Sequence, residues 1–599
     1  MNKKELHVLL QRYASVPMPP WEEQYLDFHG ARYLETMAVL GPGEGGSLLD
    51  VGAFPGHITL LAQHLGFKVK GLTGRAESTP SLDQIIERLG RHQIPVAVGD
   101  VESEFFPFPD ESFDVVLASE IIEHLHFNPF RLLREAFRVL KPGGRIIVST
   151  PNLARLENLI HLLAGRSVHS KITRRFYEAF SSILSARHLR EYTASELTYM
   201  LEGQNKEIYR FEKTRVFYSA CLDPPFRWPI LAGLIGHLWP RFRSTLLVEA
   251  VRPERATLIH PEQAEPTLGF YPVEEHSADM DGIARMFTTP FRWTRGSAEL
   301  SLPAGQALYQ VFSLHLVYLA PISLHPVILT VGVGEKIIGR VRLSPDREFT
   351  PIRIILPVGL ACEGRFTLRF HCPTWRPVDH PGKDDYEFSL NDSRDLGLVM
   401  GWDGFLREDC RDLPALLKLI EGDFLHPGRP QGVAPCWIPP HPIYLLRDKK
   451  KTSLRMGSED WRHLGWGWHQ IESWENGLIR WSSGLAEAYL SAGPGAGKLS
   501  IRLFTGERAL GEEITGDLEL SWVSDRLLEG PSTRTAFNLP AAVWTDLQAD
   551  LPPPLFSSGG VLRAVLRVDP ARVPALIVPD SQDRRELGLA VAGMTLYGS

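Results

Sequence analysis

SLLDVGAFPGHIT, at residues 47–59, is the stretch on which the fold of the first half of this chain depends. Its opening run, 47–51, places Asp50 in a short apolar segment, which predicts a buried strand. Gly52 and Gly56 then frame a tight turn, and the apolar residues after them recur at helical spacing. Strand, glycine turn and helix are the parts of a nucleotide-binding βα unit, in which glycine lets a ligand approach the backbone closely.

Strands and helices continue to alternate along residues 20–252. A helix over 20–40 precedes the first strand, and another over 131–140 ends at the Lys-Pro-Gly-Gly of 141–144. Further strands are expected at 68–72, 94–98, 113–118 and 145–149, with a sheet-edge strand at 246–251 and helices in 154–165 and 195–203. This order predicts an α/β fold, a mostly parallel sheet with helices on both faces.

Four segments in this order resemble class I S-adenosylmethionine-dependent methyltransferases over about residues 20–252. They are LLDVGAFPG at 48–56, GDVE at 99–102, FDVVLASEIIEHL at 113–125 and LKPGGRIIVSTPN at 140–152. The resemblance implies a Rossmann-like domain over 1–252 that holds S-adenosyl-L-methionine at Asp50, Gly52, Ala53, Phe54, Gly56, Thr73, Asp100, Val101 and Ser119. Two positions depart from the family, because Phe54 replaces a glycine and Thr73 replaces an acidic residue that grips the ribose. A decayed cofactor site is therefore an open alternative.

A second cluster, Ser-Glu-Ile-Ile-Glu-His, follows the fourth strand at 119–124. If this segment is helical, Glu120, Glu123 and His124 share one face. Two carboxylates and an imidazole suit Mg or Mn. The motif resembles the metal site of ubiquinone-biosynthesis O-methyltransferases and small-RNA 2′-O-methyltransferases, which implies His188 as a fourth ligand.

The resemblance assigns the catalytic roles to Glu123, His124 and His188. A bound metal would lower the pKa of an acceptor hydroxyl and so favour its attack on the sulfonium methyl group. Two alternatives stay open: His124 or His188 acts as a general base without metal, or the cluster is purely structural because acidic residues are common near helix starts.

Beyond residue 252 the chain changes from helical to alternating patterns rich in Gly and Pro turns, which is typical of antiparallel sandwiches. Three motifs occur twice: 269–274 matches 467–472, 292–296 matches 480–484, and 394–398 matches 585–589. The sequence therefore predicts a linker at 253–268, a β-sandwich at 269–404, a linker with a short helix at 405–460 and a second β-sandwich at 461–599.

The two copies resemble jelly-roll accessory domains found beside bacterial glycan-building enzymes. Sugar binding would need exposed aromatic faces, and the candidates are Tyr271, Trp375, Trp402, Trp466, Trp468 and Trp474. Trp293 and Trp481, in the repeated Arg-Trp motif, are expected in the core because tryptophans are heavily buried on average. A scaffold role for the copies is the alternative.

Composition limits which partners and which cellular compartment are expected. The net charge of −7 gives no general attraction to nucleic acid, and the five dispersed cysteines contain no CxxC pair, which favours a reducing compartment. The apolar stretch 228–239 is too short to span a bilayer; it is interpreted as a buried helix, with an interfacial helix as the alternative. No signal peptide is apparent. A cytoplasmic protein is expected, with peripheral contact at the inner face of the membrane left open.

The sequence favours an O-methyltransferase acting on a sugar hydroxyl of a bacterial surface polysaccharide or glycolipid. The sandwiches would position the glycan beside the catalytic domain, and glycan-assembly enzymes would be partners. The arginine-rich region 153–190 would be a lid over the acceptor pocket or an anion-binding surface. One alternative is methylation of a small aromatic or quinone-like hydroxyl; the other is a non-catalytic glycan-binding or assembly protein.

Overall fold

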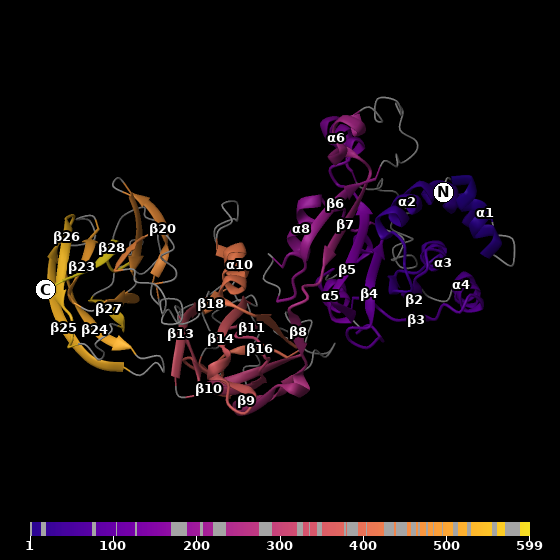
Figure 1. Ribbon diagram of the computed structural model, residues 1–599. Helices are drawn as coiled ribbons and strands as arrows, with labels where there is room; N and C mark the ends of the chain where they lie inside the picture. Colours follow the sequence, from indigo (N-terminus) through magenta and orange to yellow (C-terminus); the bar gives the residue numbers. More distant parts are fainter. Residues whose placement is uncertain are drawn as a thin grey trace. The chain divides into compact units, whose positions relative to one another are not determined.

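The computed structural model falls into two compact units (Figure 1). The first comprises 1–258, 405–409 and 418–434, and the second comprises 259–404, 410–417 and 435–599. The structure describes residues 3–13, 20–74, 80–102, 105–125, 129–168, 188–203, 208–219, 235–274, 290–319, 327–334, 336–343, 350–376, 379, 393–402, 404–424, 436–438, 452–456, 463–464, 468–474, 477–482, 484–493, 495–506, 513–523, 529–553, 560–569 and 587–598.

A seven-stranded sheet forms the first unit, in the order β3-β2-β1-β4-β5-β7-β6. Its strands are β1 (Ser47–Val51), β2 (Lys68–Thr73), β3 (Val96–Val98), β4 (Phe113–Ser119), β5 (Leu140–Pro151), β6 (Glu212–Tyr218) and β7 (Thr245–Val251). The first five are mutually parallel, as predicted. The prediction of an edge strand at 246–251 is wrong: β7 pairs with β5 on one side and β6 on the other, which its nearly continuous burial requires.

Helices cover both faces of this sheet (Figure 1). They are α1 (Lys3–Tyr13), α2 (Pro20–Leu40), α3 (His57–His64), α4 (Pro80–Arg91), α5 (Pro129–Val139) and α8 (Ala194–Leu201), whereas α6 (Leu156–Leu163) stands out from the sheet (Figure 1). Alternate strand residues serve opposite layers: Leu48 packs in the core with α1 to α4, and Leu49 packs in the core with α5 and α8. The helices predicted at 20–40, 131–140, 154–165 and 195–203 are confirmed as α2, α5, α6 and α8. Residues 141–144, which were predicted only to end the helix before them, already belong to strand β5.

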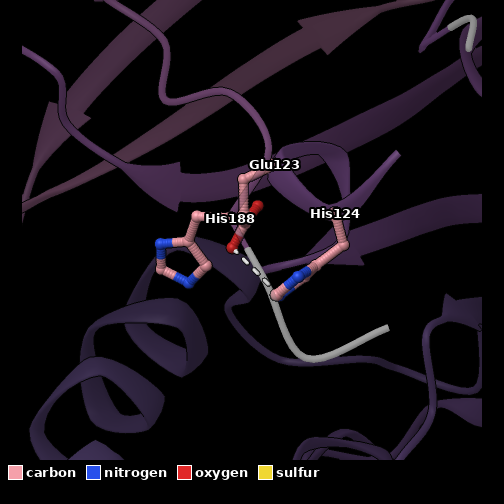
Figure 2. A group of neighbouring side chains, drawn as sticks. All are labelled: Glu123, His124 and His188. Atoms are coloured by element: carbon pink, nitrogen blue, oxygen red, sulfur yellow. Dashed lines mark ion pairs between the residues drawn. The ribbon is translucent and has the colours of Figure 1, made fainter. Parts of the chain in front are cut away.

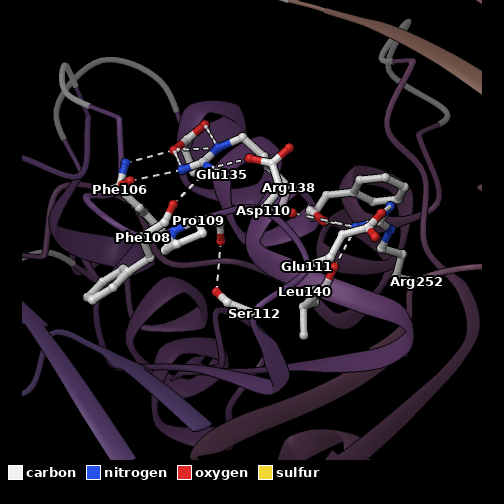
Figure 3. Close-up of polar contacts among 11 residues, drawn as sticks. Phe106, Phe108, Pro109, Asp110, Glu111, Ser112, Glu135, Arg138, Leu140 and Arg252 are labelled. Carbon is white, nitrogen blue, oxygen red and sulfur yellow. Dashed lines mark hydrogen bonds and ion pairs between the residues drawn. The ribbon is translucent and has the colours of Figure 1, made fainter. Parts of the chain in front are cut away.

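The turn that precedes β4 is held by two arginines (Figure 3). Arg138, on α5, donates to Glu135 and Asp110 at 2.7 Å and to two backbone carbonyls of the turn. Glu135 in turn accepts the backbone N–H of Phe106 at 2.7 Å. Arg252, fully buried, donates to Glu111 at 2.7 Å and to main-chain carbonyls of α5. We call these five side chains the Arg138 network: Asp110, Glu111, Glu135, Arg138 and Arg252. Each of them has a partner of opposite charge.

The stretch 253–268, predicted as a linker, contains regular structure: strand β8 (Ala256–Ile259), a 3-10 turn (Pro261–Gln263) and the start of β9 (Glu265–Glu274). Strand β17 (Phe405–Cys410) pairs with β8, and its residues Phe405–Asp409 return to the first unit. There Leu406 joins the core under α5, and the buried Glu408 accepts from Arg210 at 3.2 Å and from Arg255 at 3.1 Å. The helix expected within 405–460 is α10 (Leu413–Phe424).

The second unit is built largely from antiparallel sheets, as predicted. The first sandwich region contains β9, β10 (Phe291–Pro303), β11 (Tyr309–Val317), β12 (Val327–Val333), β13 (Lys336–Leu343), β14 (Thr350–Pro357), β15 (Arg365–His371), β16 (Val399–Gly401) and β18 (Cys436–Ile438). The second contains β19 (Ser453–Arg455), β20 (Trp468–Trp474), β21 (Gly477–Ser482), β22 (Leu485–Ala492), β23 (Ala496–Phe504), β24 (Glu513–Val523), β25 (Glu529–Pro540), β26 (Trp544–Asp550), β27 (Gly560–Asp569) and β28 (Ala590–Gly598). Each region buries many apolar side chains, and most of those of the second form one contiguous cluster.

The repeated motifs form the same hydrogen-bonded seam in both copies. In the first, Thr294 N donates to Leu398 O at 2.8 Å, Gly397 N to Thr294 O at 2.7 Å and Leu398 N to Thr294 Oγ1 at 2.8 Å. In the second, Ser482 makes the corresponding three bonds with Leu589 and Gly588, each at 2.8 Å. The strand register also agrees, because Trp293 faces Val399 and Trp481 faces Ala590. Equal contacts at equivalent positions support two copies of one fold.

Candidate functional site

The glycine turn after β1 requires its glycines. Gly52 and Gly56 have φ of +84° and +95°, a region that side chains rarely adopt. A Cβ on Gly52 would also lie 3.1 Å from Ile121, and one on Gly56 would lie 3.3 Å from Leu89. The N–H groups of Gly52 and Ala53 both donate to Leu72 O, at 2.8 Å and 3.1 Å, which fixes the turn against β2.

The residues expected to bind the cofactor lie along one edge of the sheet. Because β1 to β4 are parallel neighbours, their carboxyl ends meet there, at Asp50–Ala53, Thr73, Asp100–Val101 and Ser119. Thr73 and Val101 are buried, whereas Asp100 is exposed and accepts the N–H of Glu102. Phe54, the departure from the family pattern, is largely exposed and not packed in the core. The turn is therefore not filled by a buried phenyl ring.

Asp50 is fully buried beneath this turn. Thr59 Oγ1, on the first turns of α3, donates to Asp50 Oδ2 at 2.6 Å. Burial raises the pKa of Asp50 to about 6, although the hydrogen bond from Thr59 acts in the opposite direction.

Segment 119–124 is not a continuous helix, so one predicted ligand is turned away. Glu120 has φ of +54°, and only Ile122–His124 form a 3-10 turn. The Glu120 carboxylate pairs with Arg32 of α2 at 2.5 Å and accepts from Ser149 at 3.1 Å. The expectation that Glu120, Glu123 and His124 converge on one helical face is therefore wrong.

Glu123, His124 and His188 do come together (Figure 2). One ligand atom from each lies within 4.8 Å of the others. Glu123 Oε1 and His124 Nε2 are 3.9 Å apart, and the two imidazole centroids are 5.1 Å apart. The Leu189 N–H donates to Glu123 O at 2.7 Å, which brings His188 over the turn from 65 positions downstream (188 − 123).

Glu123 is completely buried, and its two oxygens differ. Oε2 accepts from Thr150 Oγ1 at 3.0 Å, whereas Oε1 has no hydrogen-bond partner among the residues that the structure describes. Burial, reinforced by the charge of Glu120, raises the pKa of Glu123 well above its ordinary value. An orphaned carboxylate oxygen facing two imidazoles is a donor set that suits a divalent cation. The residues present therefore fit a metal.

Sequence reasoning missed Arg32 and Thr150. Arg32 lies 88 positions before Glu120 (120 − 32) on a helix whose pattern gave no sign of a site. Thr150 is the next-to-last residue of β5, directly before the Pro-Asn of 151–152, and strand position alone could have drawn attention to it. His29, one turn before Arg32, has its pKa lowered to about 3 by burial, with the charge of Arg32 and the nearby His57 adding to the effect.

The aromatic residues proposed for sugar stacking are only partly available. Trp375 and Trp402 are buried, so the expectation that they offer exposed faces is wrong. Tyr271 is half-buried between Arg295 and Arg394, and Trp468 is half-buried with its indole N–H on Glu487 O at 2.6 Å. The side chains of Trp466 and Trp474 lie outside the described residues. Trp293 and Trp481 are core residues, as predicted.

Two further predictions fall partly outside the described residues: most of the arginine-rich region at 169–187, and 228–234 of the apolar stretch. In the described remainder of that stretch, Leu238 and Trp239 are exposed, so this part is not a buried helix. Within the described parts of the chain, we find no helix long and apolar enough to cross a bilayer.

Comparison with known proteins gives a consistent result for the first unit. The family profile "Methyltransferase domain" matches residues 49–148. An uncharacterised methyltransferase of Mycolicibacterium vanbaalenii is 31% identical over 182 residues, which are 27% of this chain and 69% of that protein. A probable S-adenosylmethionine-dependent methyltransferase of Mycolicibacterium smegmatis is 37% identical over 116 residues, 19% of this chain and 36% of that protein.

The mitochondrial ubiquinone biosynthesis O-methyltransferase of Mus musculus is 26% identical over 162 residues, 25% of this chain and 42% of that protein. The chain thus spans less than half the length of two of these three relatives. A solved SAM-dependent methyltransferase from Archaeoglobus fulgidus aligns at 16% identity with a TM-score of 0.27, over 39% of this chain and all of that one.

Proposed function

Since the chain belongs to the S-adenosylmethionine-dependent methyltransferases, we propose that it methylates a sugar hydroxyl of a surface polysaccharide or glycolipid. The observation that carries the oxygen chemistry is the cluster of a buried carboxylate and two imidazoles, Glu123, His124 and His188. It adjoins the glycine turn directly, because Ile121 packs against Gly52. A proton acceptor beside the methyl donor is what methylation of a hydroxyl needs.

The cofactor would lie over the glycine turn, held by backbone groups of 52–56 and by the residues at the carboxyl edge of the sheet. When bound, S-adenosylmethionine supplies a methyl group on a sulfonium sulfur; the acceptor oxygen bonds to that carbon as the carbon–sulfur bond breaks and sulfur keeps the electron pair. Thr73 would contribute one hydroxyl to the ribose, which binds a diol less firmly than a carboxylate.

Glu123, His124 and His188 would act on the acceptor. An imidazole of His124 or His188 takes the proton of the acceptor hydroxyl, and the buried carboxylate of Glu123 stabilises the imidazolium. In the alternative with a metal, Glu123 Oε1 and the two imidazoles would instead hold Mg²⁺ or Mn²⁺, which would lower the pKa of a bound hydroxyl. Arg32 keeps Glu120 neutralised, so three protein ligands remain for the ion.

The sugar assignment rests on the second unit. Two copies of a β-sandwich with the same seam add binding surface that a methyltransferase of small molecules does not need. They would hold a polymer near the catalytic residues and raise its local concentration. Glycan-assembly enzymes would be the protein partners. Cys362, Cys372 and Cys410 are free thiols, which supports action in the cytoplasm.

A second candidate is a small aromatic or quinone-like hydroxyl. The mouse relative is named as a ubiquinone biosynthesis O-methyltransferase, and this favours that acceptor class for the first unit. It leaves the second unit without a role.

The test is methyl transfer from labelled S-adenosylmethionine to isolated surface polysaccharide, glycolipid and a catechol. Activity should fall by a factor of about 10² to 10⁴ in His188→Ala, and not in His161→Ala, a half-buried histidine on α6 outside the cluster. Excess chelator should remove activity and Mn²⁺ or Mg²⁺ should restore it. Full activity in excess chelator would exclude the metal and leave the general-base mechanism as the explanation. Transfer only to the catechol would overturn the sugar assignment. Absence of cofactor binding by calorimetry would support a decayed, non-catalytic protein.

A further inference from the structure

Exposed apolar side chains gather just beyond the catalytic cluster. Leu163 is 89% exposed, Leu162 58%, Leu238 57% and Trp239 50%. Ile160 and Leu189 are less exposed than these four, at 40% and 39%. We call these six residues the apolar rim: Ile160, Leu162, Leu163, Leu189, Leu238 and Trp239.

The three segments that carry the rim share one scaffold. The Asn152 amide, just before α6, donates to the carbonyls of Arg241 and Arg243 at 2.8 Å each. The Leu153 N–H donates to Tyr192 O at 2.9 Å, and Asn158 donates to Glu191 at 2.8 Å. Segments 153–163, 188–192 and 238–243 therefore meet at the end of β5, although they lie far apart in sequence. The α6 helix stands out from the sheet at this end (Figure 1).

Basic residues flank the apolar rim. Segments 153–168, 188–193 and 235–244 hold five arginines, at 155, 166, 190, 241 and 243, against two glutamates, at 157 and 191. Of the two, Glu191 is largely buried and pairs with Arg155 at 2.9 Å. Arg166, Arg190 and Arg241 are exposed, and of these three Arg190 pairs with Glu196 at 2.8 Å. This local excess of cations contrasts with the net charge of −7 for the whole chain.

We infer that the apolar rim docks on an anionic lipid bilayer, from which the enzyme takes a lipid-linked acceptor. Exposed leucines with a tryptophan and interspersed arginines are the composition of a surface that inserts shallowly at the headgroup level. A stable protein interface would instead be depleted of charge at its centre. The rim also begins at the site itself, since Leu189 follows His188 and bonds to Glu123. This inference rests on the proposed function only for the acceptor; the docking stands by itself.

The test is co-sedimentation of the full chain with vesicles. Vesicles of phosphatidylcholine mixed with phosphatidylglycerol should bind it, phosphatidylcholine alone should bind it much less, and added salt should weaken binding. Leu163→Asp should reduce binding at least about tenfold, because a buried leucine contributes on the order of 1.5–3 kcal/mol. Arg241→Gln should reduce it about fivefold, since a basic residue near an anionic surface contributes about 1 kcal/mol.

The matched control is Leu268→Asp. Leu268 lies in the second unit, and its side chain is 58% exposed, the same fraction as that of Leu162. The Leu268→Asp variant should bind vesicles as the unchanged protein does. Equal binding by Leu163→Asp and Leu268→Asp, or no binding to either vesicle, would overturn the docking. Vesicle binding needs neither cofactor nor acceptor, so its failure is distinguishable from failure of methyl transfer. Transfer to a glycolipid in vesicles that Leu163→Asp does not slow would overturn the lipid-linked acceptor.

Discussion

Two sets of buried charges in the first unit follow opposite rules. In the Arg138 network, Arg138 and Glu135 are paired at 2.7 Å, and Arg138 also pairs with Asp110 at 2.7 Å. In the cluster of Glu123, His124 and His188, the carboxyl group of Glu123 is equally buried but leaves one oxygen without a hydrogen-bond partner among the described residues. Burying a carboxylate oxygen without a hydrogen bond is costly, so a fold retains one only where something else requires it. The difference separates charges that stabilise the fold from a charge available for chemistry.

The largest expected effect is on activity at the orphaned carboxylate. Glu123→Gln should lower the methyl-transfer rate by a factor of about 10² to 10⁴, because the amide cannot stabilise an imidazolium or bind a cation as a carboxylate does. The same change should leave the free energy of unfolding unchanged or raise it, since the amide oxygen can still accept from Thr150 and the buried charge is gone. Rate assays and urea denaturation on one preparation measure both. Equal losses of activity and stability would contradict the comparison.

The reverse pattern is expected in the Arg138 network. Glu135→Ala should lower the free energy of unfolding by about 3–5 kcal/mol, because Arg138 loses its most buried partner and the Phe106 N–H loses its acceptor. Chemical denaturation measures this. Glu87→Ala is the control: Glu87 pairs with Arg91 on the exposed face of α4, and its loss should cost at most about 1 kcal/mol. A small effect in Glu135→Ala would mean that the network does not hold the turn.

Asp50 should behave like Glu123 and not like Glu135. Its pKa of about 6 in the folded protein exceeds the ordinary value of 3.8, so folding favours the protonated form. The stability that this carboxyl contributes is fully present below pH 4 and is lost as the pH rises through 6. Asp50→Asn should therefore be more stable than the unchanged protein by about 3 kcal/mol at pH 8, falling to about half of that at pH 5.

Denaturation curves across this pH range provide the measurement. Asp100→Asn, which removes a carboxylate at an exposed position of the same sheet edge, is the matched control. A stability gain in Asp50→Asn that does not vary with pH would show that the carboxyl does not titrate in the folded protein.

The smallest effect is expected at the repeated seam of the second unit. Thr294→Val and Ser482→Ala each remove a hydroxyl that accepts a backbone N–H in the repeated seam, at Leu398 and Leu589. Each should lower the free energy of unfolding by about 1–3 kcal/mol, because a buried N–H is left unpaired. The two losses should be similar, as equivalent positions in two copies of one fold require. Thermal denaturation of each variant checks this, and a loss in only one copy would contradict the equivalence.

Local sequence patterns predicted much of the first unit. The strands from β1 to β5 and the helices α2, α5, α6 and α8 followed from apolar periodicity and from glycine and proline signals, which act over a few residues. The interior position of β7 in the sheet could not be predicted from local patterns, because its pairing with β6 depends on contacts across the sheet. The burial of Trp375 and Trp402 likewise depends on packing that no short window contains.

The candidate site shows the same limit. Residue types and spacing identified Glu123 and His124, and a family resemblance added His188, all of which the fold brings together. Glu120 was misassigned because its left-handed backbone and its ion pair with Arg32 are set by α2, far away in sequence. Thr150 was missed although it lies at a strand end, because its hydrogen bond to Glu123 joins residues 27 positions apart.

Strand β17 has a consequence for how the protein is made. Its residues Phe405–Asp409 complete the core of the first unit, and Glu408 pairs with Arg210 and Arg255 there. On a ribosome, the catalytic unit must wait for the intervening 259–404 to be synthesised, a delay of roughly ten to thirty seconds. During that interval Arg210 and Arg255 lack their common carboxylate. A fragment that stops at residue 258 would remain in this unfinished state.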